Sequence, residues 1–347
     1  MNVLSLFDGI SCGRVALERA GIKVDKYYAS EIDKYAIQIT QKNYPDTIQL
    51  GDVNDYNKWE LPKIDLLIGG SPCQDLSVAK KDRAGLNGER SGLFWKYVEI
   101  LKLLKPKYFL LENVASMPKE AKEIITETLG VEPILINSAL VSAQQRKRLY
   151  WTNIPNITQP QDKGIALKDI LIKFNETESI PIEVKNQGKE IVKISPNKSQ
   201  SLLARDYKGF GNQNMSGAIS PIRLGEFNKG GQGDQIYSIE GKSVSLSANG
   251  GGRGAKTGLY AVPNTYINDK NIYEVKNGFI WVNDKSYAIK LPDGFYCIRK
   301  LHPIECERLQ TLPDNYTEGV SNTQRYKCIG NGWTVDVISH ILSFIEE

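Results

Sequence analysis

The chain opens with NVLSLFDGISCGRVALERAG (residues 2–21), and this stretch decides the fold class. The apolar run NVLSLF predicts a buried strand over residues 2–7, and residues 14–20 have the pattern of a helix. The turn between them contains Gly9 and Gly13, and glycines at such a turn let a ligand approach the backbone and the helix N-terminus. A strand, a glycine turn and a helix in this order are typical of a parallel sheet that binds ligands at its carboxyl edge.

The same alternation of short apolar runs and helical patterns continues to about residue 137. We expect strands at 26–30, 65–68, 108–111 and 133–137, and helices at 34–43, 93–104 and 120–129. This alternation predicts an α/β fold with a parallel, doubly wound sheet. After about residue 152 the segments become short, β-prone and rich in turns, and helical patterns return only at 302–310 and 334–345. We therefore expect a second, smaller β-rich region, with the C-terminal helix packed back on the first domain.

The composition of the 347 residues is that of a soluble globular protein, because 41% are hydrophobic and 24% are charged. No apolar run reaches the roughly 18 residues that a membrane-spanning helix needs. The apolar start contains Asp8 and Arg14 and follows no basic leader, which argues against a secretory signal. The five cysteines are far apart and form no CxxC pair, so neither a disulfide framework nor a zinc site is expected. The two histidines lie in predicted helices, and we expect no metal and a cytoplasmic location.

Positive charge is concentrated in one part of the chain. The formal net charge is +4, and the window from Ser195 to Tyr260 alone contains eight Lys and Arg against four Asp and Glu. The same window is rich in Gly, Ser and Asn. This composition suits a surface that meets a polyanion, and it suits a glycine-rich solvated loop region equally well.

Two acidic residues follow predicted strands near the glycine turn. Glu31 stands in SEID at the end of the second strand, where an acid usually binds ribose hydroxyl groups, and Asp52 stands in GDV. With the glycine turn, the two acids describe an adenosine-binding edge. Each acid by itself is also explained as a helix cap.

A second set of side chains could carry chemistry at the same edge. Cys73, in GGSPCQDLS, follows the strand at 65–68, and a thiolate at this position would be a strong nucleophile. Glu112 ends the neighbouring strand in LLENV, and QQRKR supplies Arg146 and Arg148 at alternating positions that share one face of a strand. Together these groups can hold a polar, planar heterocycle.

Nine short motifs of this chain resemble, in order and spacing, those of the cytosine-5 DNA methyltransferases. They are FDGISCG (7–13), EID (31–33), GDV (51–53), SPCQ (71–74), RSGLF (90–94), ENV (112–114), QQRKR (144–148), RKLHPIECERLQTLP (299–313) and GNGWTVDVI (330–338). They span nearly the whole chain except about 155–298, the variable target-recognition region in this family. Most motifs are similar to bacterial and phage members, whereas FDGI, the DLS after SPCQ and the Trp of GNGW are similar to eukaryotic de novo enzymes.

The resemblance implies a Rossmann-like, S-adenosylmethionine-dependent methyltransferase sheet with a smaller β-rich target-recognition domain. We expect residues 1–185 with 326–347 to form the catalytic and cofactor-binding domain, and 186–325 the recognition domain. The implied enzyme is a DNA (cytosine-5-)-methyltransferase of the restriction-modification type. It flips a cytosine out of double-stranded DNA at a short specific sequence and methylates C5. We expect a monomer without an obligatory protein partner, associated with the nucleoid through DNA.

The resemblance also implies roles for individual residues. Cys73 would bond to C6 of the cytosine, Glu112 would hydrogen-bond N3 and the exocyclic amine, and Arg146 and Arg148 would bind the O2 edge, beneath a lid at 76–91. The implied cofactor-binding residues are Phe7, Gly9, Ile10, Gly13, Glu31, Ile32, Asp52, Val53, Pro72, Leu93, Asn331 and Trp333. The implied DNA-binding residues are Gln74, Ser77, Arg90, Arg205, Arg223 and Arg253, with phosphate contacts from Lys198, Lys208, Lys229, Lys242 or Lys256.

Three alternatives use a similar sheet. A nicotinamide dehydrogenase needs neither the Pro-Cys loop nor the paired arginines. A tRNA cytosine-5 methyltransferase of the same fold usually has a compact, differently composed recognition insert, whereas this one is long and glycine-rich. A catalytically silent DNA-binding relative should have lost Cys73 or Glu112, and both are present.

Overall fold

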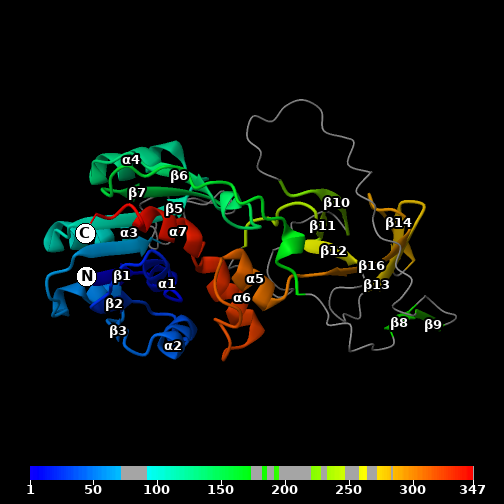
Figure 1. Ribbon diagram of the computed structural model, residues 1–347, viewed down its shortest axis with the longest axis horizontal. Helices are drawn as coiled ribbons and strands as arrows, with labels where there is room; N and C mark the ends of the chain where they lie inside the picture. The colour runs from blue at the N-terminus through cyan, green and yellow to red at the C-terminus, as the bar shows by residue number, and fades with distance from the viewer. Residues whose placement is uncertain are drawn as a thin grey trace.

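The computed structural model describes residues 1–71, 92–172, 220–227, 233–246, 258–263, 272–282 and 284–346, together with the backbone of the strands β8 (Ile182–Lys185) and β9 (Ile191–Ile194). Two seven-stranded sheets lie toward opposite ends of an elongated molecule (Figure 1). Helices α5 (Pro303–Leu309) and α6 (Asn322–Asn331) lie between the two sheets.

The first sheet carries the motifs of the N-terminal half. Its strands are β1 (Asn2–Leu6), β2 (Lys26–Ser30), β3 (Ile48–Gln49), β4 (Leu66–Gly70), β5 (Tyr108–Val114), β6 (Ile134–Asn137) and β7 (Lys147–Thr152). Their order is β3-β2-β1-β4-β5-β7-β6, and neighbouring strands are parallel except where β7 is involved. The chain leaves β1 toward β2 on one side and returns to β4 on the other. The carboxyl ends of β1 and β4 therefore flank the crevice in which such sheets bind ligands.

Helices cover both faces of this sheet. One face carries α1 (Cys12–Arg19), α2 (Lys34–Asn43) and α7 (Val335–Leu342), and the other carries α3 (Leu93–Leu104), α4 (Lys119–Leu129) and the short turn η1 (Val53–Lys58). Two cores form because successive side chains of a strand point to opposite faces. Leu66 and Ile68 of β4 enter the first core and Leu67 enters the second, and all three are fully buried.

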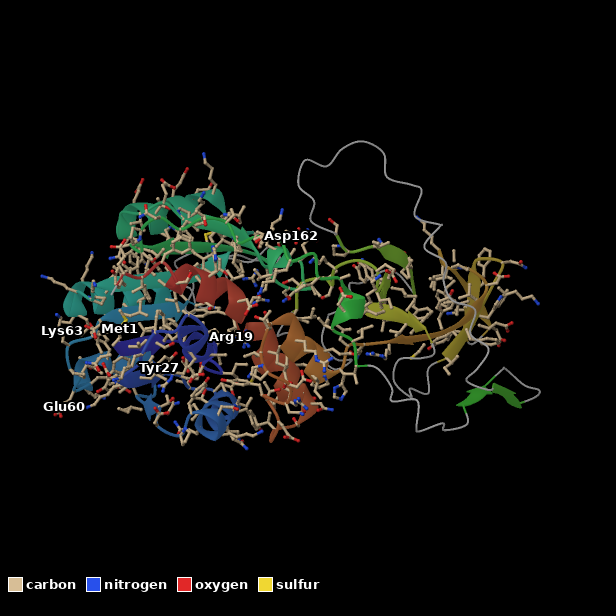
Figure 2. The ribbon with its side chains drawn as sticks, in the orientation of Figure 1. Met1, Arg19, Tyr27, Glu60, Lys63 and Asp162 are labelled. Atoms are coloured by element: carbon tan, nitrogen blue, oxygen red, sulfur yellow. The ribbon has the colours of Figure 1, made fainter. Side chains whose placement is uncertain are left out.

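The C-terminal helix α7 packs beside α1, as the sequence predicted. Arg19 at the end of α1, labelled in Figure 2, pairs with Asp336 of α7 at 2.6 Å between Nη1 and Oδ1. Lys163 pairs with the other oxygen of the same carboxylate at 2.9 Å. The two ends of the chain therefore share one core.

The predicted α/β architecture is confirmed, and β2, α2 and α3 coincide with the predicted ranges. The expectation of an all-parallel sheet is wrong for β7, which is antiparallel to both of its neighbours. Only residues 138–146, with the short turn η3 (Ser138–Leu140), connect β6 to β7. A parallel crossover needs a dozen residues or more, so the chain turns back on itself. Helix α6 was not predicted, because Gly330 and Asn331 in its last turn indicated a turn in the sequence.

The second sheet confirms the predicted β-rich region. Its strands are β10 (Arg223–Glu226), β11 (Gln235–Ser238), β12 (Leu259–Pro263), β13 (Ile272–Lys276), β14 (Phe279–Val282), β15 (Lys285–Ala288) and β16 (Gly294–Arg299). Their order is β10-β11-β12-β16-β13-β14-β15, and every pair is antiparallel except β11 with β12. Ile236, Val275, Ile280 and Ile298 are buried in its own core. Strands β8 and β9 form a separate hairpin.

A third core joins the two sheets. Tyr260 and Val262 of β12 pack in it with Leu309 of α5, Ile329 of α6 and Leu167 of the turn η4 (Leu167–Asp169). The side chains of this core come from both halves of the molecule, so the second sheet packs against α5 and α6. Across the part of the chain described above, no helix is both long and apolar enough to cross a membrane.

Candidate active site

The carboxyl ends of β4 and β5 place Glu112 at the centre of the site. Gly70 and Glu112 are partners in the parallel pairing of the two strands. Arg148 Nε lies 2.8 Å from Glu112 Oε1, and Trp333 Nε1 donates a hydrogen bond to Oε2 at 3.2 Å. A Cβ atom on Gly70 would lie 2.9 Å from Trp333 Nε1 and 3.0 Å from Glu112 Oε2. Glycine at this position therefore makes room for the Glu112 carboxylate and for the Trp333 indole that donates to it.

The end of β4 is tied to the end of β5. Asn113 Nδ2 donates to Ser71 Oγ at 3.0 Å and to the Ser71 carbonyl at 3.4 Å. Ser71 is followed by Pro72 and Cys73, and these two residues lie outside the described part of the chain, as do Gln74, Ser77 and Arg90. The structure thus describes the site up to the residue that precedes the Pro-Cys loop.

The two predicted arginines have different partners, because Arg148 pairs with Glu112 and Arg146 bonds to the main chain. The Arg146 guanidinium is buried and donates to the carbonyl groups of Leu246 (3.1 Å), Gly332 (3.0 Å) and Gly330 (3.3 Å). The physical reason lies in the packing around it, because the segment 242–246 and the end of α6 bring these carbonyl groups within reach of the guanidinium.

Two glutamines that sequence reasoning missed complete a buried polar network around Arg146. Gln144 Oε1 accepts from the Leu246 amide at 2.8 Å, and its Nε2 donates to Gln310 Oε1 at 3.2 Å. Gln310 Nε2 donates to the Gly332 carbonyl at 3.0 Å. Both glutamines are fully buried. Their places in QQRKR and ERLQ were the only sequence signals.

At the edge that was predicted to bind adenosine, Glu31 accepts hydrogen bonds from three backbone amides. Gly9 has φ +62°, and its amide donates to Glu31 Oε2 at 2.8 Å. Glu31 Oε1 accepts from the amides of Ile32 and Asp33, both at 2.8 Å. Ile32 beside it is 73% exposed, an unusual state for a large apolar side chain. Glu31 therefore stabilises the glycine turn and lies next to the exposed apolar side chain of Ile32.

The other predicted cofactor residues are placed as follows. Asp52 caps η1 by accepting from the Asn54 amide at 2.9 Å, which matches the capping interpretation. Ile10 and Val53 are buried. A Cβ atom on Gly13 would lie 2.4 Å from Ile68 Cδ1, so glycine at this position allows close packing of α1 on the sheet. Phe7 (φ +58°) lies in the turn after β1, Leu93 begins α3, Asn331 is the exposed last residue of α6, and Trp333 follows it.

Asp8 is a second feature that sequence reasoning missed. Its carboxylate accepts hydrogen bonds from the hydroxyl groups of Tyr27 (2.8 Å) and Ser11. The pKa of Asp8 is raised from 3.8 to about 6, because burial and, to a smaller extent, the charge of Glu31 outweigh the hydrogen bonds that lower it. The turn that begins with FDG thus carries a carboxyl group that titrates in the range of mildly acidic pH.

The four described cysteines are buried, and none of them is in a disulfide: Cys12, Cys297, Cys306 and Cys328. Burial raises the pKa of Cys12 and of Cys328 to about 12, and raises that of Cys306 as well. These three thiols are therefore protonated at neutral pH and are poor nucleophiles.

The predicted DNA-binding residues fall mostly outside the described part, which includes neither Arg205 nor Arg253. Arg223 is exposed on β10 and forms an ion pair with Glu226. The expectation that Lys242 contacts phosphate is wrong, because its side chain is fully buried and its ammonium group is bonded to carbonyl oxygens.

A family model described as C-5 cytosine-specific DNA methylase matches residues 1–347. The chain is 29% identical over 362 residues to the type II methyltransferase M.HhaI of Haemophilus parahaemolyticus, with 98% of this chain and 93% of that protein covered. It is 28% identical to the orphan methyltransferase M.SPRI of Bacillus phage SPR, with 98% and 96% covered.

Solved structures show the same fold. A putative DNA modification methyltransferase encoded within an E. coli prophage matches with a TM-score of 0.59 at 18% identity, covering 99% of this chain and 98% of that one. The S. pombe Dnmt2 methyltransferase matches with a TM-score of 0.58 at 15% identity, covering 99% and 97%. The resemblance of the nine motifs is thus confirmed, and the chain belongs to the C-5 cytosine-specific DNA methylase family as a DNA (cytosine-5-)-methyltransferase.

Proposed function

We propose that the chain transfers a methyl group from S-adenosylmethionine to C5 of a cytosine flipped out of double-stranded DNA at a short specific sequence. The observation that carries the proposal is the Glu112 carboxylate, held between Arg148 and Trp333 at the carboxyl ends of β4 and β5. Cys73 stands two residues beyond Ser71 in the sequence, and two residues span at most about 7 Å of chain. A nucleophile and an oriented carboxyl group therefore belong to one edge of the sheet.

The residues at the neighbouring strand ends fit S-adenosylmethionine. The exposed Ile32 side chain would offer an apolar surface to a flat adenine ring, Glu31 supplies a carboxylate beside it, and Asp52 follows β3, the next strand of the sheet. The turn at Gly9 would hold the methionine part of the cofactor. When bound, the cofactor supplies an electrophilic methyl group and leaves as a neutral thioether.

In the proposed reaction Cys73 acts as nucleophile. Its thiolate adds to C6, so a sulfur–C6 bond forms and the electrons of the C5–C6 double bond become available at C5. C5 then takes the methyl group. Loss of the C5 proton to solvent re-forms the double bond and breaks the sulfur–C6 bond, which returns Cys73. Glu112 hydrogen-bonds N3 and the exocyclic amine of the flipped base and favours the addition.

The two arginines take different parts in this proposal. Arg148 holds Glu112 through Nε and binds the O2 edge of the base through Nη2, where it stabilises developing charge. Arg146 stays a positioning residue, because its guanidinium group already donates to three main-chain carbonyl groups.

The second sheet supplies recognition in the proposal. We assign residues 186–325 to a target-recognition domain and 1–185 with 326–347 to the catalytic domain. The local surplus of Lys and Arg between Ser195 and Tyr260 favours a polyanion as partner. Double-stranded DNA is the proposed partner, and the enzyme acts as a cytoplasmic, nucleoid-associated monomer.

The proposal is tested by trapping the covalent adduct. With S-adenosylmethionine and duplex DNA that contains 5-fluorocytosine, elimination is blocked, so a denaturation-resistant complex should accumulate. Cys73→Ala should form none, whereas the matched control Cys297→Ala, in the second sheet, should form it normally. A complex with Cys73→Ala would refute the mechanism. Labelled methyl groups that enter tRNA and not duplex DNA would refute DNA as substrate, and bisulfite sequencing of DNA from expressing cells would map the target.

A further inference from the structure

The segment KSVSL (242–246) docks against the QQRKR motif at the junction of the two sheets. The Ser243 amide donates to the Ala143 carbonyl at 2.7 Å, and the Gln145 amide donates to the Ser243 carbonyl at 2.9 Å. Gln144 and Ser243 form a parallel β-bridge. Asp162, labelled in Figure 2, lies at this junction. A short piece of the proposed recognition region thus forms an isolated β-bridge with the start of this motif, just before β7.

Lys242 anchors this segment from inside the protein. Its side chain is 0% exposed, and its ammonium group donates to the carbonyl oxygens of Ser142, at 2.9 Å, and Ile165. Three stretches of chain meet at one nitrogen atom. Burial lowers the pKa of Lys242, and the negative charges of Asp162 and Asp169 raise it.

Burying an ammonium group is expensive, and an apolar side chain of similar length would fill the same space at less cost. Unlike an apolar side chain, the lysine makes directional hydrogen bonds, because its N–H donors must meet two particular carbonyl groups. Such a contact fixes the register of one segment on another, in the way that a single buried polar residue fixes the register of a coiled coil.

The register of the segment 242–246 on the QQRKR motif determines the hydrogen-bond partners of Leu246. The Leu246 amide donates to Gln144 Oε1 at 2.8 Å, and its carbonyl accepts from Arg146 Nη1 at 3.1 Å. Arg146 Nη2 reaches the Gly332 carbonyl at 3.0 Å, and the next residue, Trp333, donates to Glu112. Hydrogen bonds from Leu246 to Gly332, the peptide bond to Trp333 and the hydrogen bond of its indole therefore link the recognition side of the junction to the carboxylate of the site.

We propose that Lys242 is a positioning residue that holds the segment 242–246 in the register through which recognition orients Glu112. The inference rests on the proposed function, because it assigns methyl transfer to Glu112 and DNA recognition to the second sheet. A displaced Leu246 would free Arg146 from one of its carbonyl partners and loosen the turn that carries Trp333. The expected consequence is slower methyl transfer without weaker binding of S-adenosylmethionine.

The test replaces Lys242 by methionine in the full-length protein and measures the single-turnover rate, normalised to sites titrated with 5-fluorocytosine DNA. Lys242→Met should lower this rate about tenfold or more, because a small displacement of a catalytic group is enough to cost a factor of this size. The dissociation constant of S-adenosylmethionine should stay within about twofold of wild type. Lys168→Met is the matched control, because Lys168 is an exposed lysine at the same junction that pairs with Glu240 at 2.6 Å. It should leave the rate unchanged.

A double-mutant cycle distinguishes positioning from a merely structural role. If Lys242 acts through Trp333, then Lys242→Met combined with Trp333→Phe should be no slower than the slower single variant. Multiplying rate losses, or a normalised rate equal to wild type in Lys242→Met, would overturn the inference. If Lys242→Met does not fold, two other variants carry the test: Lys242→Gln keeps two N–H donors and should retain most of the wild-type rate, whereas Lys242→Leu keeps none and should not. Equal rates in these two variants would overturn the inference too. A wild-type enzyme that methylates no DNA would instead refute the proposed function.

Discussion

Asp8→Asn should remove a pH dependence of stability that originates in the glycine turn. The carboxyl group has its pKa raised from 3.8 to about 6, chiefly by burial. A group whose pKa is raised on folding contributes stability that is fully present below its unfolded pKa and is lost as the pH rises through its folded pKa. A rise of about two units corresponds to about 3 kcal/mol in total, of which about 2.5 kcal/mol falls between pH 4 and pH 7.

The asparagine amide can keep the contacts of this carboxyl group. Its oxygen can accept from the Tyr27 hydroxyl, and its nitrogen can donate to the Ser11 oxygen, so the geometry of the turn is preserved while the titration is lost. Urea unfolding of wild type and Asp8→Asn at several pH values gives the free energy of unfolding of each. Subtracting the two cancels every other titrating group.

The expected result is that wild type loses about 2.5 kcal/mol relative to Asp8→Asn between pH 4 and pH 7. Glu60→Gln, which removes a carboxylate at an exposed position, is the control for the loss of one charge. A difference between wild type and Asp8→Asn that is flat from pH 4 to pH 7 would show that Asp8 does not titrate in this window, and the account of the turn would fail.

Two further predictions concern the two halves of the site. Glu31→Ala removes the acceptor of the Gly9 amide and should weaken S-adenosylmethionine binding in calorimetry by roughly 1.5–3 kcal/mol, about tenfold or more, with DNA affinity nearly unchanged. The control is Asp33→Ala, which removes the cap of α2 and should lower the free energy of unfolding without changing cofactor binding. If Glu31→Ala binds the cofactor as tightly as wild type does, the result favours the interpretation of Glu31 as a helix cap. Gly70→Ala should lower kcat for DNA methylation at least tenfold with little change in melting temperature, because the new methyl group displaces Glu112 and Trp333. An unchanged kcat would contradict the crowding at this position.

Much of the fold could be predicted from local sequence. Helix α2 covers the predicted 34–43 because Asp33 caps it and accepts from the Tyr35 amide at 2.9 Å, an interaction between near neighbours in the chain. The positions of Glu31 and Glu112 at strand ends were also predictable, since strand–helix alternation puts the carboxyl ends of parallel strands at one edge. The direction of β7 was not, because it depends on the length of one connection and not on the apolar pattern of the strand.

The sequence by itself determined the family, the doubly wound sheet and the residue types at its carboxyl edge, because ordered motifs and alternating patterns are properties of short stretches of chain. Only the tertiary structure decided what Arg146 and Lys242 do. Both are basic residues, and the sequence suggested that they face the base and the phosphates. Lys242 bonds to Ser142, 100 residues away, and Arg146 bonds to Leu246, also 100 residues away. Contacts across such separations exist only once the two sheets are packed together, because packing creates the buried carbonyl groups that these side chains satisfy.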